Sequence, residues 1–212
     1  MNEFTTTTNI LRAHLMVAPK NDVRFYLAGI YVDMRGNKGT DPALVSTDGH
    51  RLLVTRITEF FNGNRGSLCI IHRALIEAVI KISTSKKGVD VLVQIDDKKN
   101  LVSLTANGMT FSKELVDGRY PDYRKVIPSE TSGETSVLNE NYRGDAMKIC
   151  QLLGYDKPYL SVHENGTSAA RIEINKNTIF LVMPTRPESG YDPRTLVRHD
   201  DSWLIPRNMK SK

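Results

Sequence analysis

The chain has 212 residues and a formal net charge of +5, which leaves room for one large domain or two small ones around a real core. Its hydrophobic fraction of 40% and charged fraction of 25% are ordinary for a soluble globular protein. The sequence has no apolar run long enough to span a bilayer and no secretion signal, so we expect a cytoplasmic protein that makes no membrane contact. The excess of positive charge is compatible with contacts to phosphates, but alone it is weak evidence.

The cysteines and histidines do not indicate a metal site. Cys69 and Cys150 lie in apolar contexts and, without a secretion signal, are expected to be buried, reduced thiols. No CxxC or HExxH pattern is present, and the five histidines lack the spacing of metal ligands. We therefore expect no metal and no cofactor.

The first part of the chain predicts a helix followed by strands. A short helix is expected over residues 9–17, with Asn9 or Thr8 as its N-cap. Turn-forming residues at 36–39 and 47–49 separate the segments that follow. The strands expected here are 25–34, 43–45 and 51–57.

The same plan then repeats twice, with a period of roughly 65 residues. The second unit is expected to contain strand 68–71, helix 73–83 and strands 89–95, 101–105 and 109–115, with turns at 96–100 and 107–108. The third unit is expected to contain strand 136–138, helix 142–153 and strands 159–162, 170–174 and 178–183.

A polar, turn-rich linker at 128–133 is the best domain boundary. The predicted organisation is therefore a domain over 1–129, a half domain over 134–187 and a C-terminal tail over 188–212. The tail is rich in charge and proline but contains the apolar group Trp203, Leu204 and Ile205. Two interpretations of this group stay open: it folds back onto a sheet, or it acts as a short recognition peptide.

Two motifs carry most of the information about function. Residues 47–54 read TDGHRLLV, and residues 115–128 read LVDGRYPDYRKVIP. With DVRFYLAG at 22–29, they closely resemble the bacterial DNA polymerase III beta subunit, the sliding clamp family. The resemblance runs from about residue 21 to 128 and covers the family's middle domain. FLVMPTR at 180–186 resembles the strand that ends the family's last domain.

The resemblance implies an α+β DNA-clamp fold, built of repeated halves in which helices line one face of antiparallel sheets. A family member has three domains of two halves each, whereas this chain has about three halves. Because clamps of this type close as rings of twelve halves, four chains are needed, and we expect a homo-oligomeric ring, preferably a homotetramer. The alternative is that the chain pairs with a host clamp or does not close a ring. The small size also suggests a compact genome such as that of a bacteriophage.

The resemblance further implies a DNA sliding clamp, or processivity factor, which encircles double-stranded DNA without sequence preference and has no catalytic residues. DNA polymerase and the clamp loader would bind a groove through short apolar peptide motifs, and the apolar floor with a basic rim suits that role. The groove residues implied are Arg24, Tyr26, Leu27, Thr47, Gly49, His50, Arg51, Leu52, Pro121, Val126, Met183, Pro184 and Arg186.

In this family the helices line the hole, so basic residues on or beside the expected helices are the candidates for phosphate contacts. These candidates are Arg12, Lys20, His72, Arg73, Lys81, Arg143 and Lys148. For each of them, a solvated helix surface is the alternative explanation.

Two other functions remain as alternatives. A clamp mimic would sequester clamp-binding partners without encircling DNA. An enzyme, such as a nuclease or a hydrolase using His50 beside Asp48 and Ser46, is disfavoured, because the sequence lacks a clustered set of metal ligands and a nucleophile elbow. We therefore expect that the protein is not an enzyme.

Overall fold

The computed structural model describes residues 1–35, 41–62, 68–83, 85, 87–155 and 160–185. The α-helices in these ranges are α1 (Thr8–Val17), α2 (Arg73–Lys81) and α3 (Glu140–Leu152), and two short 3-10 helices are η1 (Phe25–Leu27) and η2 (Tyr123–Val126). The strands are β1 (Asn2–Thr7), β2 (Ile30–Asp33), β3 (Ala43–Thr47), β4 (Arg51–Arg56), β5 (Glu59–Asn62), β6 (Leu68–Ile71), β7 (Asp90–Asp96), β8 (Leu101–Ala106), β9 (Met109–Glu114), β10 (Ser161–His163), β11 (Ala170–Asn175) and β12 (Thr178–Val182).

The strands form two antiparallel sheets. One has the order β5-β1-β7-β8-β9, and the other has the order β10-β11-β12-β4-β3-β2-β6. Each α-helix precedes a three-stranded antiparallel set: α1 precedes β2, β3 and β4; α2 precedes β7, β8 and β9; and α3 precedes β10, β11 and β12. The larger sheet joins the first and third sets through β4 and β12, from Thr55 opposite Thr178 to Arg51 opposite Val182.

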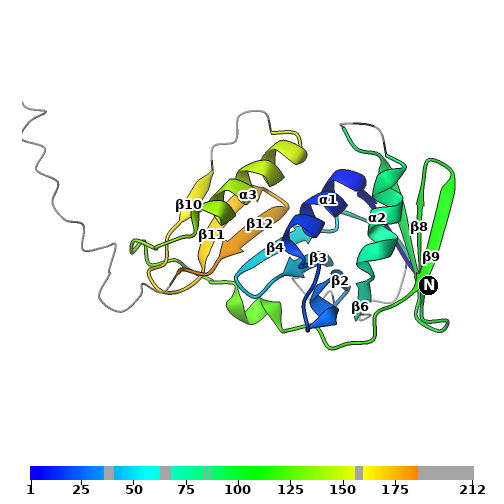
Figure 1. Ribbon diagram of the computed structural model, residues 1–212, viewed down its shortest axis with the longest axis horizontal. Coiled ribbons are helices and arrows are strands. Elements are labelled where there is room, and N and C mark those ends of the chain that lie inside the picture. The colour runs from blue at the N-terminus through cyan, green and yellow to red at the C-terminus, as the bar shows by residue number, and fades with distance from the viewer. Residues whose placement is uncertain (36–40, 63–67, 84, 86, 156–159, 186–212) are drawn as a thin grey trace, which may run out of the picture.

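The three α-helices lie side by side on one side of the sheets, with α1 between α3 and α2 (Figure 1). The apolar face of α2, with Leu75, Ile76 and Val79, packs with residues of the five-stranded sheet in one core. A second core joins Ala13 of α1 to Ile149 of α3 over the seven-stranded sheet. Burial of these apolar faces is what holds the helices in one layer.

The opposite face of the seven-stranded sheet is covered by the segment that follows β9. Tyr120 and Tyr123 of this segment are 8% and 5% exposed and pack with Tyr31 of β2. The rings of Tyr31 and Tyr120 are stacked with their centroids 4.5 Å apart. Covering on both faces explains why every residue of β2 is buried, where an alternating pattern would mark a one-sided strand.

The helix boundaries differ by a few residues from those expected. The N-cap of α1 is Thr7, not Asn9 or Thr8, because β1 runs directly into the helix and the Thr7 hydroxyl accepts the Ile10 N–H at 3.3 Å. The third helix begins at Glu140, behind the N-cap Asn139. The second helix ends at Lys81.

Several strand predictions need correction. The strands β1 and β5 were not expected, and residues 25–29 are not extended but form η1 and its exit. At Gly29 a Cβ atom would stand 2.3 Å from the carbonyl oxygen of Ile71, so glycine is what allows the backbone to pass this close to β6 before entering β2. Residues 136–138 are not a strand, although the Val137 carbonyl accepts the Thr185 N–H at 2.8 Å.

Several polar and thiol groups are part of the core. Cys69 and Cys150 are buried and unpaired. His14 of α1 is fully buried, with Nδ1 3.0 Å from the Ser46 hydroxyl and Nε2 3.1 Å from the Thr55 hydroxyl. Burial lowers the pKa of His14 to about 3, so its neutral ring links α1 to β3 and β4.

Candidate functional site

A groove of about 320 Å³ opens where β4 begins and β12 ends. Its walls come from the η1 region, the β3–β4 turn, the η2 segment and the residues around β12, so segments far apart in the sequence meet there. The described residues that line it are Arg24, Leu27, Thr47, Gly49, His50, Arg51, Leu52, Pro121, Asp122, Tyr123, Val126, Ala169, Leu181 and Met183.

The structure brings ten of the thirteen expected groove residues together in this cavity. Tyr26 is an exception, because it lines a different cavity with Tyr31 and Tyr120. Pro184 follows Met183 but is not among the described lining residues, since the Thr185–Val137 hydrogen bond carries the chain away toward the third unit. Arg186 lies outside the described residues.

The β3–β4 turn is held by its own side chains. The Thr47 hydroxyl accepts the Gly49 N–H at 3.0 Å and donates to the Arg51 carbonyl at 2.7 Å. The Asp48 carboxylate accepts the backbone N–H groups of His50 and Arg51 at 2.9 and 3.0 Å. Gly49 has φ +94°, a left-handed conformation that favours glycine. These bonds make the turn a rigid wall of the groove.

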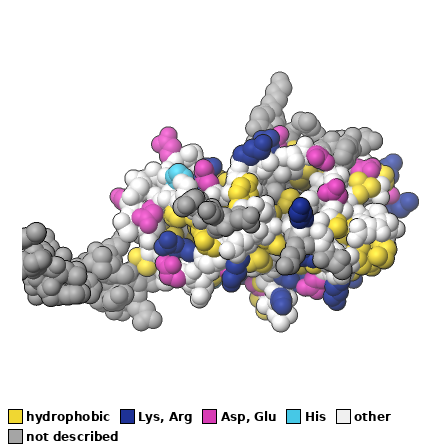
Figure 2. Space-filling model, turned by 90° about the horizontal axis from the view of Figure 1, so that it is seen from above, with side chains coloured by type: hydrophobic (Ala, Val, Ile, Leu, Met, Phe, Trp, Pro, Cys, Tyr) yellow, Lys and Arg dark blue, Asp and Glu magenta, His cyan; other side chains and the backbone are white. Residues whose placement is uncertain are grey.

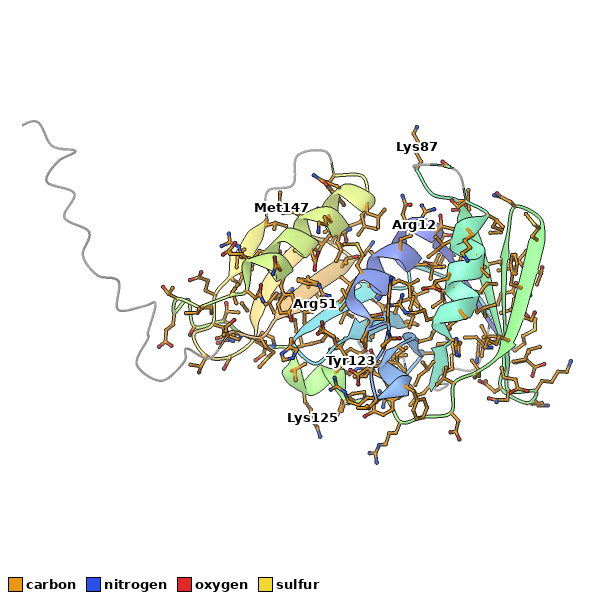
Figure 3. All side chains as sticks on the ribbon, in the orientation of Figure 1. Arg12, Arg51, Lys87, Tyr123, Lys125 and Met147 are labelled. Carbon is orange, nitrogen blue, oxygen red and sulfur yellow. The ribbon has the colours of Figure 1, made fainter. Side chains whose placement is uncertain are left out.

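Arg51 fixes this wall to two helices. Its guanidinium contacts the Asp48 carboxylate, the Met16 carbonyl at 2.9 Å and the Asp145 carboxylate of α3, and it lies 4.9 Å from the ring centroid of Tyr142. Its side chain is only 13% exposed, and Figure 3 shows it between α3 and α1. Arg51 therefore supports the groove from behind and connects it to the third unit, in contrast to the rim position expected from the sequence.

Arg24 lies on the opposite, exposed side of the turn. It forms a two-pronged ion pair with Asp22, with N–O distances of 3.0 and 2.7 Å, and donates to the Asp48 carbonyl at 3.1 Å. The hydrogen bond from Arg24 lowers the pKa of Asp22 to about 2, so the pair stays charged at neutral pH. Arg24 thus places a positive charge at the rim of the groove, fixed in position by the ion pair with Asp22.

The floor of the groove is apolar and continuous between strands. Leu52 and Leu181 are directly opposite each other in the β4–β12 pairing, and both are buried. Met183 lies two residues after Leu181, on the same face of the strand, and is 41% exposed. Leu181 was not among the expected groove residues, although residues two apart in a strand share a face and Leu181 is two residues before Met183.

Tyr123 and Val126 form the remaining wall, and a buried charge cluster positions it. The Tyr123 hydroxyl donates to the Asp33 carboxylate at 3.1 Å, and this carboxylate is fully buried. Arg35 and Arg124 also contact it, at 3.1 and 3.0 Å. Burial opposes the ionised form, but the hydrogen bonds and charges of the two arginines outweigh it and lower the pKa of Asp33. Asp122, Tyr123 and Ala169 are further lining residues that were not predicted.

The expected DNA-contacting residues divide into two groups. Lys20, Lys81, Arg143 and Lys148 are exposed, although Arg143 pairs with Glu140 at 3.2 Å and Lys148 with Asp145 at 3.3 Å. On the face seen from above, basic side chains are interspersed with acidic ones and form no single continuous patch (Figure 2). Such an arrangement suits weak contacts to phosphates better than tight binding.

The other three expected DNA contacts hold helices in place. Arg12 donates to the carbonyls of Ile80 and Ser83 at 3.3 and 3.0 Å and so ties α1 to the end of α2. His72 is the N-cap of α2 and accepts the Ala74 N–H on Nδ1. Burial and, to a smaller extent, the charge of Lys113 lower its pKa, which keeps the ring neutral at neutral pH.

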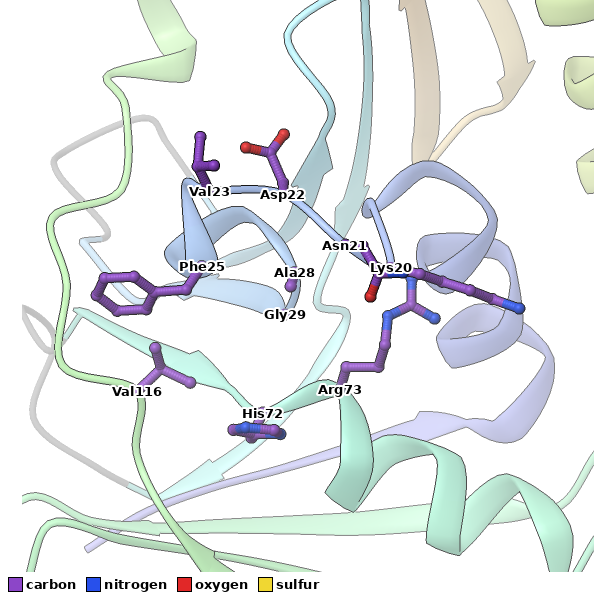
Figure 4. A pocket seen from close by; sticks show the side chains of 10 residues that line it. All are labelled: Lys20, Asn21, Asp22, Val23, Phe25, Ala28, Gly29, His72, Arg73 and Val116. Atoms are coloured by element: carbon purple, nitrogen blue, oxygen red, sulfur yellow. The ribbon is translucent and has the colours of Figure 1, made fainter.

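Arg73 is the clearest case of a structural role. It donates to the carbonyls of Leu15 and Ala18 at 3.0 and 2.5 Å and satisfies the end of α1. Its side chain is 11% exposed. Figure 4 shows it reaching from the start of α2 toward the end of α1, while the Lys20 side chain points away. The basic residues offered to a ligand are therefore fewer than the sequence indicated.

The described residues do not assemble a catalytic or metal site. Ser46 is buried against His14, and Asp48 accepts backbone N–H groups, so the side chains of Ser46, Asp48 and His50 do not form a triad. Among the described residues, no group of three His, Cys, Asp or Glu side chains is placed to hold a metal ion. Within the same ranges, none of the helices has the length and apolar character needed to cross a membrane.

Residues 4–122 match the family model described as DNA polymerase III beta subunit, central domain. The beta sliding clamp of Pseudomonas aeruginosa is 30% identical over 177 residues, which cover 76% of this chain and 47% of that protein. The chain spans less than half the length of the curated relatives it matches.

Solved structures show the same fold. A putative DNA polymerase III beta subunit from Eubacterium rectale has a TM-score of 0.68 and 12% identity, covering 87% of this chain and 66% of that one. The Helicobacter pylori beta clamp bound to a DNA ligase peptide has a TM-score of 0.62 and 17% identity, covering 88% of this chain and 66% of that one. The expected α+β clamp fold is therefore confirmed.

Proposed function

Because this chain belongs to the DNA polymerase III beta subunit family, we propose that it is a sliding clamp that encircles duplex DNA and tethers a DNA polymerase to it. The observation that carries this proposal is the groove at the meeting of β4 and β12. A processivity factor acts by raising the effective concentration of its partner at the DNA, so a partner-binding groove is its central requirement. The activity makes and breaks no covalent bond.

The groove is suited to a short peptide with apolar anchors. Leu52 and Leu181 form its floor, Val126 and Met183 present exposed apolar surface, and Arg24 lies at the rim. A peptide can bury aliphatic or aromatic side chains on this floor while the rim contacts its polar backbone. The peptide-bound Helicobacter pylori clamp shares the fold, which supports assigning the same kind of ligand here. Polymerase and clamp loader are the partners we propose.

Binding of a short apolar peptide to two matched valine variants tests the groove. Val126 lies in the groove and is 48% exposed, whereas Val23 lies outside it and is 98% exposed. Val126→Ala should weaken peptide binding several-fold, since it removes an apolar contact worth about 1 kcal/mol, and Val23→Ala should not. Equal effects of the two substitutions on the dissociation constant would contradict the assignment.

The proposed ring rests on the number of helix-and-strand units in the chain. The chain contains three helix-and-strand units whose helices share one face, and a ring of twelve such units requires four chains. The helix layer then faces the DNA, and Lys20, Lys81, Arg143 and Lys148 supply contacts to phosphates without sequence preference. Arg12, His72 and Arg73 support this layer by holding its helices.

A further inference from the structure

The outer edge of β9 is an unpaired strand edge at one end of the molecule. In the described part of the chain, β9 pairs only with β8, while β10 lies at the opposite end (Figure 1). The pairing with β8 is regular from Ala106 opposite Met109 to Leu101 opposite Glu114, with no bulge. No proline interrupts β9. Proteins usually interrupt, twist or cover such an edge, so a long regular one indicates a pairing partner.

The backbone groups available at this edge follow from the hairpin turn. Asn107 and Gly108 form a two-residue turn with φ values of 49° and 74°, so the pair that closes it, Ala106 and Met109, is hydrogen-bonded. Hydrogen-bonded and non-hydrogen-bonded pairs alternate along the ladder. The N–H and C=O groups of Thr110, Ser112 and Glu114 therefore point outward, away from β8.

The chain itself shows how such an edge is used. The third strands of the first and third units, β4 and β12, pair antiparallel and join two units into one sheet, while α1 and α3 pack above the joint. The strand β9 is the third strand of the second unit. Within the described residues, β4 and β12 each have a neighbouring strand on both sides, so neither can pair with β9. The equivalent third strand that is left as a partner for β9 is β9 of another copy.

We propose that β9 of one chain pairs antiparallel with β9 of a second copy across a two-fold axis. The charges on β9 are compatible with this arrangement. Lys113 and Glu114 lie at the C-terminal end of the strand, and the uncharged Phe111 and Ser112 lie near its centre. Because outward-facing residues pair with outward-facing residues, the pair is centred on Ser112, where the two Lys113 residues are roughly 7 Å apart along the strands and water screens their exposed side chains.

The contact has a consequence for the clamp, and this step rests on the proposed function. A two-fold axis perpendicular to a shared sheet keeps both helix layers on the same side but reverses the strand direction. The groove lies at one end of the strands, where β4 begins and β12 ends. Paired chains therefore present their grooves on opposite rims of the ring, and partners can bind from both sides of it.

Mass measurement of two Ser112 variants tests the pairing. Both variants remove the 2.7 Å hydrogen bond between the Ser112 and Ser103 hydroxyls. Ser112→Pro also removes an outward N–H while leaving the backbone hydrogen bonds to β8 in place, whereas Ser112→Ala leaves the backbone unchanged. Four chains of 23.9 kDa give about 96 kDa. The alanine variant should keep this mass, and the proline variant should lose at least half of it, because each lost β9 contact separates two chains. A proline variant with unchanged mass, or a wild-type chain that is monomeric at tens of micromolar, overturns the proposal.

Crosslinking tests the β9 contact independently, including the case in which the proline variant fails to fold. Ser112→Cys places a thiol at the centre of the proposed pair, and Ser132→Cys places one on the exposed linker away from it. A short bismaleimide should link two copies of the first variant and not of the second. Equal linking of both variants, or of neither, contradicts the β9 contact. The valine test of the groove is read independently, so failure of one proposal is distinguishable from failure of the other.

Discussion

Replacing Asp33 tests whether the buried charge cluster positions the groove wall. The carboxylate is fully buried and accepts from Tyr123 and two arginines, whose side chains are 41% and 31% exposed. Asp33→Asn removes the charge and weakens three contacts, while the arginines regain water. We expect a loss of about 3 kcal/mol in the free energy of unfolding, the lower end for breaking a buried ion pair. For a chain of this length, that lowers the melting temperature by roughly 6–12 °C.

The matched control is Asp41→Asn. Asp41 forms an exposed ion pair with Arg56 at 3.2 Å, with side-chain exposures of 59% and 53%, and such pairs contribute well under about 1 kcal/mol. Urea unfolding of both variants gives the comparison, and peptide binding to Asp33→Asn should weaken because η2 loses its anchor. If Asp33→Asn costs no more than Asp41→Asn, the cluster does not hold this wall.

Further outcomes follow from the same structure. Since burial lowers the pKa of His14 to about 3 from the ordinary 6.5, the unfolded chain takes up a proton that the native chain does not. This contribution to the free energy of unfolding is fully present above pH 6.5 and falls by about 1.4 kcal/mol per pH unit below it. The free energies of unfolding at pH 7.5 and pH 5 should therefore differ by about 2 kcal/mol, and His14→Gln should reduce this difference. Combined Lys20→Glu and Lys81→Glu should weaken salt-dependent DNA retention without lowering the melting temperature; unchanged retention would exclude the helix layer as the DNA-facing surface. Arg73→Gln should instead lower the unfolding free energy by about 2 kcal/mol, because it uncovers two carbonyls at the end of α1, and an unaltered melting temperature would refute that role.

Local patterns predicted most of the elements and much of the groove. The apolar periodicity of residues 73–83 and the Asn107-Gly108 turn identified α2 and the β8–β9 hairpin, because these signals depend on near neighbours. The groove residues were predicted from the family resemblance of four stretches, at 22–29, 47–54, 115–128 and 180–186. Ten of the thirteen line one cavity, and the exceptions lie where the chain turns away or outside the described residues.

Long-range pairing could not be predicted in the same way. The strand β1 pairs with β5 and β7, and no pattern in residues 2–7 indicates those partners. The roles of Arg12, Arg51 and Arg73 also depend on distant atoms. Each of these arginines donates to backbone carbonyls of another element, which the sequence does not reveal. A basic residue on an expected helix is therefore a weak indicator of DNA contact.

Topological retention on DNA tests the central claim most directly. The protein is threaded onto linear duplex DNA, the DNA is closed into a circle by ligation, and the complex is washed at high salt, which removes contacts to phosphates. A ring that encircles the duplex should stay on the circle and leave it when a restriction enzyme cuts the DNA. Equal loss from circular and linear DNA would show that the chain does not encircle DNA, as expected of a clamp mimic.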